Sequence, residues 1–233
     1  MEYKIVNYIQ KRITISLKEQ KERLFSGHVN ILVKDQLPEN IDLDHVLKTI
    51  EKKIPSHLFY NLDSVIVAHL DVFDERSINA MYADGALYIT NLQDNNKDMI
   101  DDIVHELSHS VEELDPLHIY GDQALEIEFL SKRMSLFGAL RNAGYDTEPE
   151  YFHNVEYDKY FDMYLYKEIG YDRLEILSTS IFSRPYAATS LREYFATGFE
   201  EFYLGNRNFL KDISPILYLK LVQLHKGENK DES

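Results

Sequence analysis

The spacing of hydrophobic residues changes near residue 95, and this change predicts two regions of different secondary structure. Before it, short runs rich in β-branched and aromatic residues predict strands, whereas after it apolar residues recur every three or four positions, as in amphipathic helices. Strands are expected at residues 3–8, 12–17, 29–33 and 64–70, with a helix at 43–54 that Pro55 ends. Helices are expected at residues 123–143, 157–169, 173–182, 190–204 and 208–224.

These elements predict an α+β fold in a single domain over residues 1–225. We expect a lobe over residues 1–95 that combines a mixed sheet with helices, and a mostly helical lobe over residues 96–225. Residues 226–233 are charged and are expected to be a disordered tail. Residues 145–171 are rich in tyrosine and acid, which favours a half-buried helix with its hydroxyls in water; a substrate groove is the alternative.

One predicted helix, over residues 99–113, combines a single apolar face with an H-E-x-x-H sequence. The apolar face is formed by Ile100, Ile103, Val104, Leu107, Val111 and Leu114. His105 and His109 fall opposite this face, one helical turn apart, so both imidazoles can reach one metal ion. Glu106 between them can act on a metal-bound water. The alternative is a solvated polar face that matches the motif by chance.

The stretch just before this helix has the pattern of a β-hairpin. Asp84-Gly85 is a tight-turn dipeptide between strand-like residues 80–83 and 86–90. In HExxH peptidases an edge strand upstream of the metal helix lines the cleft and pairs with extended substrate. Both arms of the hairpin are candidates for that strand, and an ordinary meander hairpin is the alternative.

Composition and charge narrow the classes of partner and of metal site. The chain has 233 residues, 44% of them hydrophobic, and a net charge of −15, which argues against nucleic acid or an anionic membrane surface as partner. Cysteine is absent, so a metal must be bound by His, Asp or Glu. The sequence shows no membrane span and no secretory signal, so a cytoplasmic protein is the default expectation; a mature secreted form would look the same.

A catalytic zinc normally has three protein ligands, and several residues are candidates for the third. Asp115 occupies a position used in a related ligand arrangement, but Glu112 stands where that arrangement has glycine for a sharp turn. His118 and His153 are further options. Glu193 lies on the predicted helix over residues 190–204, opposite its apolar face.

The segment around Glu193 resembles the downstream motif of the lethal-factor-like metallopeptidases, which include the Pro-Pro endopeptidases. The similar residues are Glu193-Tyr-Phe-Ala-x-x-Phe199, with Tyr186 seven positions before the glutamate. Ser108 stands where this family usually has glycine, and the connection from His109 to Glu193 is longer than the family's usual spacing. For Glu193 itself, a capping box formed with Ser190 is the alternative interpretation.

The resemblance implies a zincin-like fold of the gluzincin kind, with a zinc cleft between the two lobes and an edge hairpin beside it. By the same resemblance, His105, His109 and Glu193 would bind one Zn²⁺ per chain, Glu106 would be the general base, and Tyr186 would stabilise the oxyanion.

We therefore expect a zinc metallopeptidase, specifically an endopeptidase, that hydrolyses peptide or protein substrates through a zinc-activated water. Asp102 or Glu112 would accept the second N–H of a ligating histidine. Two rivals are a zincin-fold binding or regulatory protein without turnover, and a helical interaction protein whose motif is accidental.

Overall fold

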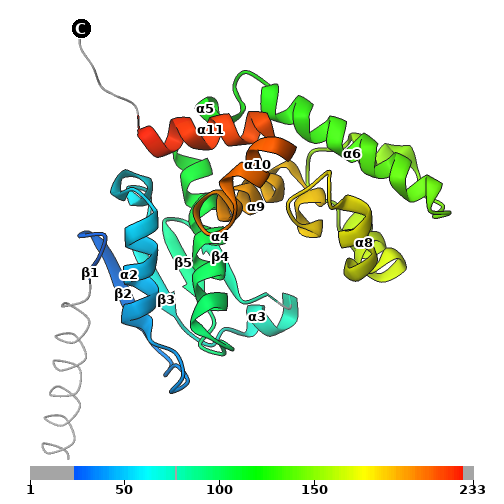
Figure 1. Cartoon of the computed structure of the whole chain (residues 1–233). Coiled ribbons are helices and arrows are strands. Elements are labelled where there is room, and N and C mark those ends of the chain that lie inside the picture. The colour runs from blue at the N-terminus through cyan, green and yellow to red at the C-terminus, as the bar shows by residue number, and fades with distance from the viewer. Residues whose placement is uncertain (1–23, 77, 228–233) are drawn as a thin grey trace, which may run out of the picture. The chain divides into compact units, whose positions relative to one another are not determined.

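The computed structural model describes residues 24–76 and 78–227. The predicted strands at 3–8 and 12–17, and the tail from residue 228 onward, lie outside the described residues. The contacts within the chain divide it into two compact units, of which unit 1 ends at Ser110 and unit 2 begins at Val111. The architecture is α+β: a mixed five-stranded sheet and a set of helices can be followed in Figure 1.

Unit 1 contains the sheet, whose strands have the spatial order β1-β2-β3-β5-β4. These strands are β1 (Leu24–Phe25), β2 (Val29–Val33), β3 (Ser64–Val67), β4 (Ala80–Ala83) and β5 (Ala86–Ile89). The central pairs β2–β3 and β3–β5 are parallel, and the two outer pairs are antiparallel. Ile31, Val65 and Leu87 lie in register across the three central strands, and all three are buried.

The predicted hairpin is confirmed as β4 and β5, joined by a two-residue turn. Asp84 and Gly85 both have positive φ, 49° and 77°, which is the conformation that an Asp-Gly turn between twisted strands requires. A side chain at position 85 would also approach Asp63, because a Cβ built there lies 2.9 Å from Asp63 Oδ2. The backbone of the turn therefore favours glycine at position 85, and a larger residue would also displace the Asp63 side chain.

Helix α2 (Leu43–Lys53) confirms the predicted helix before Pro55. Asp42 caps its first turn by accepting a hydrogen bond from His45 N, and Val46 and Ile50 face the core. Strand β3 is shorter than predicted and ends at Val67, because His69 N donates to the Asp35 side chain instead of continuing the ladder. A further helix, α3 (Asp71–Arg76), follows at once and has no counterpart in the predictions.

Helix α4 (Asn96–Leu114) is the predicted metal helix and spans the boundary between the two units. The Asn95 side chain caps it by accepting from the backbone N–H groups of Lys97 and Asp98. Its predicted apolar face is buried except at Leu114, which is 51% exposed. The prediction was wrong there because the helix ends at Leu114, so that residue has no following turn to hold it against the core.

Among the residues described, unit 2 consists of helices and the turns that join them, with no strand. Its helices are α5 (Pro116–Tyr120), α6 (Ala124–Asn142), α7 (Lys159–Met163), α8 (Tyr171–Ser178), α9 (Leu191–Tyr203), α10 (Arg207–Ile213) and α11 (Pro215–Lys226). A π-helical segment, Tyr164–Ile169, extends α7 and ends before Gly170, at the same residue as the helix predicted over 157–169. The helix predicted at 208–224 is two helices, because Pro215 lacks an N–H and begins α11.

Two features of the helical unit follow from side-chain size and polarity. Helices α9 and α11 pack closely at Gly198, where a Cβ would overlap Leu217 Cδ2. In the tyrosine-rich segment Tyr157 and Tyr160 are exposed while Phe161 is buried, which agrees with the predicted half-buried helix.

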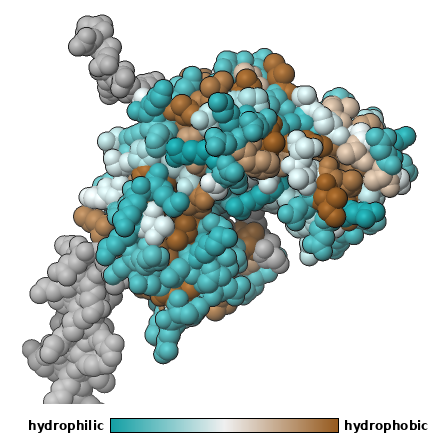
Figure 2. Space-filling model, in the orientation of Figure 1, coloured by the Kyte–Doolittle hydropathy of each residue, from teal (hydrophilic) through white to brown (hydrophobic). Residues whose placement is uncertain are grey.

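The face of the molecule seen in Figure 2 is mainly polar, with hydrophobic residues interspersed among hydrophilic ones. None of the helices among residues 24–76 and 78–227 is both long and apolar enough to cross a membrane.

Candidate metal centre

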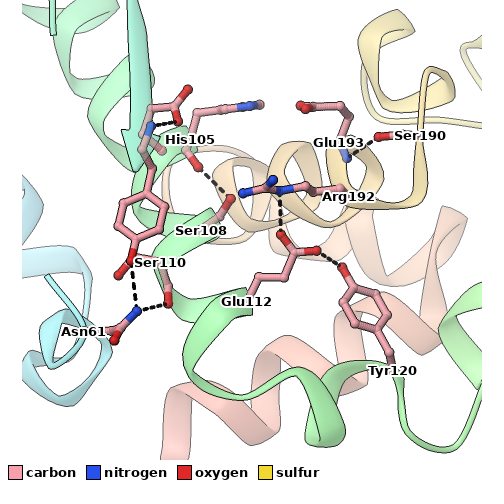
Figure 3. A network of polar contacts seen from close by, with 11 residues as sticks. Asn61, His105, Ser108, Ser110, Glu112, Tyr120, Ser190, Arg192 and Glu193 are labelled. Carbon is pink, nitrogen blue, oxygen red and sulfur yellow. Dashed lines mark hydrogen bonds and ion pairs between the residues drawn. The ribbon is translucent and has the colours of Figure 1, made fainter. Parts of the chain in front are cut away.

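His105 and His109 project from neighbouring turns of α4, as the spacing predicts. Their ring centroids lie 5.1 Å apart with the planes at 82°, and His109 is only 6% exposed. Ser108, between them, is fully buried, and its hydroxyl donates to the His105 carbonyl oxygen at 2.6 Å (Figure 3). The hydroxyl of this buried serine is therefore satisfied within the helix.

Glu106 is oriented by a backbone group of strand β4. Its Oε2 accepts a hydrogen bond from Tyr82 N at 2.7 Å. In the hairpin register Tyr82 lies opposite Leu87, at a position whose backbone groups point away from β5. The general-base candidate is therefore held by the outer edge of the hairpin that precedes its helix.

The sheet order decides which hairpin arm can be an edge strand. Among the described strands, β4 is one of the two edge strands, and β5 lies between β3 and β4. Strand β5 was wrongly included as a candidate to pair with an extended substrate, because its backbone groups already bond to neighbours on both sides. Only β4 keeps that candidacy.

Helix α9 presents Glu193 in its first turn. Ser190 is the N-cap, and its Oγ accepts from Glu193 N at 3.1 Å, so the Ser190 half of the capping-box interpretation is correct (Figure 3). Phe195 and Phe199 are buried on the other side of the helix, as predicted. Glu200, later on the same helix, is 3% exposed and pairs with Arg184 at 2.5 Å.

The two histidines and Glu193 form a group of potential metal ligands. Each offers one ligand atom, and these three atoms lie within 4.8 Å of one another. Among the described residues, no such group contains Asp115, His118 or His153. Asp115 instead precedes α5, with its carboxylate 3.9 Å from His118 Nδ1. Two imidazoles and one carboxylate are a ligand set found in catalytic zinc sites.

Tyr186 lies in a short 3₁₀ turn, Pro185–Ala188, directly before the cap of α9. Its side chain is 37% exposed. Burial of the hydroxyl, and then the negative charge of Glu193, raise the pKa of Tyr186 well above its usual value. The phenol is protonated at neutral pH, as any tyrosine with an ordinary pKa would be, and it can donate a hydrogen bond.

Arg133 of α6 holds this turn in place, a role that the sequence does not reveal. The side chain is fully buried, and burial lowers the pKa of Arg133 to about 10. Its Nε and Nη2 donate to the carbonyl oxygens of Ala188 and Thr189 at 2.9 and 3.1 Å. Its Nη1 donates to the carbonyl oxygens of Tyr151 and Asn154. These partners could not be predicted from the sequence, because nothing in the residues next to Arg133 indicates which distant carbonyl groups it contacts.

Glu112 and Asp102 have partners other than those the sequence suggested. Glu112 Oε1 accepts from the Tyr120 hydroxyl at 2.5 Å, and Oε2 pairs with Arg192 Nε at 3.0 Å (Figure 3). Asp102 accepts from Gln93 Nε2 at 3.2 Å. Their predicted role as acceptors for the ligating histidines stays a prediction.

Comparison with known proteins adds no family assignment. The chain matches no protein-family model, and searches of curated proteins and of solved structures found no match. The arrangement can bind a divalent metal, present a carboxylate base beside it, and offer a phenol donor near the third ligand.

Proposed function

We propose that this protein is a zinc-dependent metallopeptidase of the zincin kind, related in its site to the lethal-factor-like group. The observation that carries the proposal is the set of three ligand atoms, from His105, His109 and Glu193, within 4.8 Å of one another. Spacing alone predicts the histidine pair, whereas the third member comes from a helix far along the sequence. A chance motif gives no reason for a carboxylate to approach both imidazoles.

The donor set fits zinc better than other common metals. With two nitrogen ligands and one carboxylate, one coordination position remains for water, as in catalytic zinc sites. Bound zinc would lower the pKa of that water towards ~7 and polarise the substrate carbonyl. Octahedral oxygen sites for magnesium or calcium need more carboxylate and carbonyl ligands than this group provides.

Glu106 is the residue to which we assign proton transfer. It would accept a proton from the attacking water and deliver it to the leaving amine. The hydrogen bond from Tyr82 N fixes Oε2, so the carboxylate presents Oε1 in a defined direction. The base is thereby oriented before substrate arrives, which reduces reorganisation during the reaction.

Tyr186 is the residue to which we assign oxyanion stabilisation. Its protonated hydroxyl can donate a hydrogen bond to a developing negative charge, a contribution of about 3–4 kcal/mol for a single well-placed donor. Two contacts fix the turn that carries it, from Arg184 to Glu200 and from Arg133 to the carbonyl oxygens of Ala188 and Thr189. Tyr186→Phe should therefore lower kcat more than it changes zinc content.

The substrate class proposed is an extended peptide. Strand β4 is one of the two edge strands of the described sheet, and its residue Tyr82 contacts Glu106 through the backbone. The Tyr82 N–H is engaged by Glu106, so a peptide would pair with the remaining groups of this edge, and its backbone would then lie beside the general base.

The test compares Glu106→Gln with Glu113→Gln, an exposed glutamate later on the same helix. Each protein is incubated with a diverse peptide library, and the products are identified by mass spectrometry. We expect wild type and Glu113→Gln to cleave, and Glu106→Gln to retain zinc but lose cleavage by at least about 100-fold. Cleavage retained by Glu106→Gln would contradict the mechanism. Zinc binding without cleavage by wild type would instead favour a zincin-fold binding protein without turnover.

A further inference from the structure

The carboxylate of Glu112, near the end of α4, contacts side chains from two other helices, α5 and α9. Glu112 lies in the last turn of α4. Its carboxylate accepts a hydrogen bond from the Tyr120 hydroxyl of α5 at 2.5 Å, and it pairs with Arg192, in the first turn of α9, at 3.0 Å (Figure 3). Both oxygens are thus engaged by donors from different elements. The Glu112 side chain is 14% exposed, whereas that of Arg192 is 55% exposed.

The position of this contact relates it directly to the metal ligands. On α4, Glu112 follows His109 by three residues, so the two side chains share one face of the helix. On α9, Arg192 immediately precedes Glu193. The ion pair therefore joins the helix that carries the histidines to the turn that carries the third ligand.

Tyr120 makes the contact rigid. Its ring packs edge-on against Phe195 of α9, with ring centroids 6.4 Å apart, while its hydroxyl holds the second oxygen of Glu112. Burial and the neighbouring Glu112 carboxylate raise the pKa of Tyr120 well above its usual value, so the hydroxyl remains a donor. Glu112 is consequently fixed in one orientation towards Arg192.

We propose that Glu112, Arg192 and Tyr120 are positioning residues that hold Glu193 at the distance from His105 and His109 that a shared metal requires. This inference rests on the proposed zinc site. The ordinary alternative is a surface ion pair that contributes a little to folding. The two differ in consequence, because an ion pair with an exposed partner adds little stability, whereas partners that orient a metal ligand change affinity by about 10- to 100-fold.

The experiment measures zinc affinity by competition with a chromophoric chelator, and thermal unfolding of the metal-free proteins. We expect Arg192→Gln to bind zinc about 10- to 100-fold more weakly than wild type, with nearly the same unfolding midpoint without metal. Arg192→Lys should recover part of the affinity because it keeps the charge. The matched control, Arg173→Gln, removes an exposed arginine of α8 and should leave affinity unchanged. In cobalt-substituted protein, Arg192→Gln should alter the visible absorption spectrum because the ligand geometry changes.

A double-mutant comparison decides whether Arg192 acts through the ligand. In a Glu193→Ala background, Arg192→Gln should cause no further loss of affinity, because the ligand it positions is gone. The same fractional loss in both backgrounds would overturn the proposal, as would wild-type affinity in Arg192→Gln. If wild type binds zinc but Arg192→Gln binds it equally, this inference alone fails; if wild type binds none, the proposed function fails as well.

Discussion

The two units differ in what their interiors contain. Among the described residues of unit 1 the buried polar side chains are Thr90, Gln93, Ser108, His109 and Ser110, and none is an acid, lysine or arginine. Unit 2 buries Lys132, Arg133, Glu200 and Lys220 as well as uncharged polar residues. One unit therefore has a conventional apolar core, and the other is cross-linked by charged groups.

The reason lies in how each unit satisfies its backbone. In unit 1 the strands pair their N–H and C=O groups with one another. Unit 2 has many helix ends and turns, whose carbonyl groups need donors from elsewhere. Lys132 Nζ donates to the carbonyl oxygens of Ile181 and Ile213 at 2.5 Å each, and Lys220 Nζ to that of His118 at 2.7 Å. In the helical unit, buried lysine and arginine side chains thus donate hydrogen bonds to carbonyl groups that have no strand partner.

Replacing Arg133 should have the largest effect on stability. Arg133→Met keeps most of the volume but leaves four backbone carbonyl groups without their donor, so we expect a loss of about 3–5 kcal/mol. Urea unfolding followed by circular dichroism measures the change. Arg173→Met, at an exposed position of α8, is the control and should change stability by less than about 0.5 kcal/mol. If Arg133→Met were as stable as wild type, buried charged groups would not stabilise unit 2, and the proposed difference between the two units would be wrong.

An intermediate effect on stability is expected where helices α9 and α11 of unit 2 are in close contact. Gly198→Ala would force α9 away from Leu217 of α11 and should cost about 1–3 kcal/mol. Gly138→Ala, in α6, meets nothing within 4 Å and should stabilise by about 0.5–1 kcal/mol, because alanine favours helix. The same unfolding measurement compares the two. If both changes shift stability in the same direction, the close packing of α9 on α11 does not limit residue size.

A smaller effect is expected for a shape change in the apolar core of unit 1. Ile50→Leu, at a fully buried position of α2, conserves volume and polarity and should cost less than about 1.5 kcal/mol. Hydrogen exchange, read by mass spectrometry in peptides from α2 and β3, shows whether the loss stays in unit 1. A loss as large as that of Arg133→Met would mean that the two cores are equally sensitive.

The smallest expected effect on stability comes from the ionisation of tyrosines in unit 2, and it appears only at alkaline pH. Burial raises the pKa of Tyr171 to about 12, and those of Tyr194 and Tyr203 also lie above the usual value of 10. Between about pH 10 and 12 the unfolded chain releases protons that the folded chain keeps, so stability falls as pH rises through this window. The lowered pKa values of Lys132 and Arg133 act in the opposite direction but involve fewer groups.

Unfolding midpoints at pH 8 and pH 10.5 measure this loss, and Tyr194→Phe should reduce it. A midpoint that rises between these pH values would show that the buried cations outweigh the tyrosines.

Features set by neighbouring residues could be predicted from the sequence. The apolar faces of α4 and α9, the Asp84-Gly85 turn and the helix stop at Gly170 all depend on the chain within a few positions. The pairing of His105 with His109 is equally local, because helix geometry fixes it. Glu193 could be proposed because its own helix has a clear phase.

Features set by distant partners could not be predicted. The burial of Glu200 depends on Arg184, and the burial of Arg133 depends on carbonyl groups of two separate turns. Sheet order, which excludes β5 as an edge strand, depends on pairing with β3 rather than on any pattern within β5. Arg192 lies in a sequence typical of a helix start, which gives no indication of its partner. That partner, Glu112, is 80 positions away.

The central claim is that His105, His109 and Glu193 together bind one zinc ion. Elemental analysis of protein purified without a histidine tag tests it most directly, with Glu193→Ala and Asp115→Ala measured in parallel. We expect about one zinc per chain in wild type and in Asp115→Ala, and only trace zinc in Glu193→Ala, since a site left with two ligands binds zinc much more weakly. Trace zinc in wild type, or full zinc in Glu193→Ala with loss in Asp115→Ala, would contradict the claim.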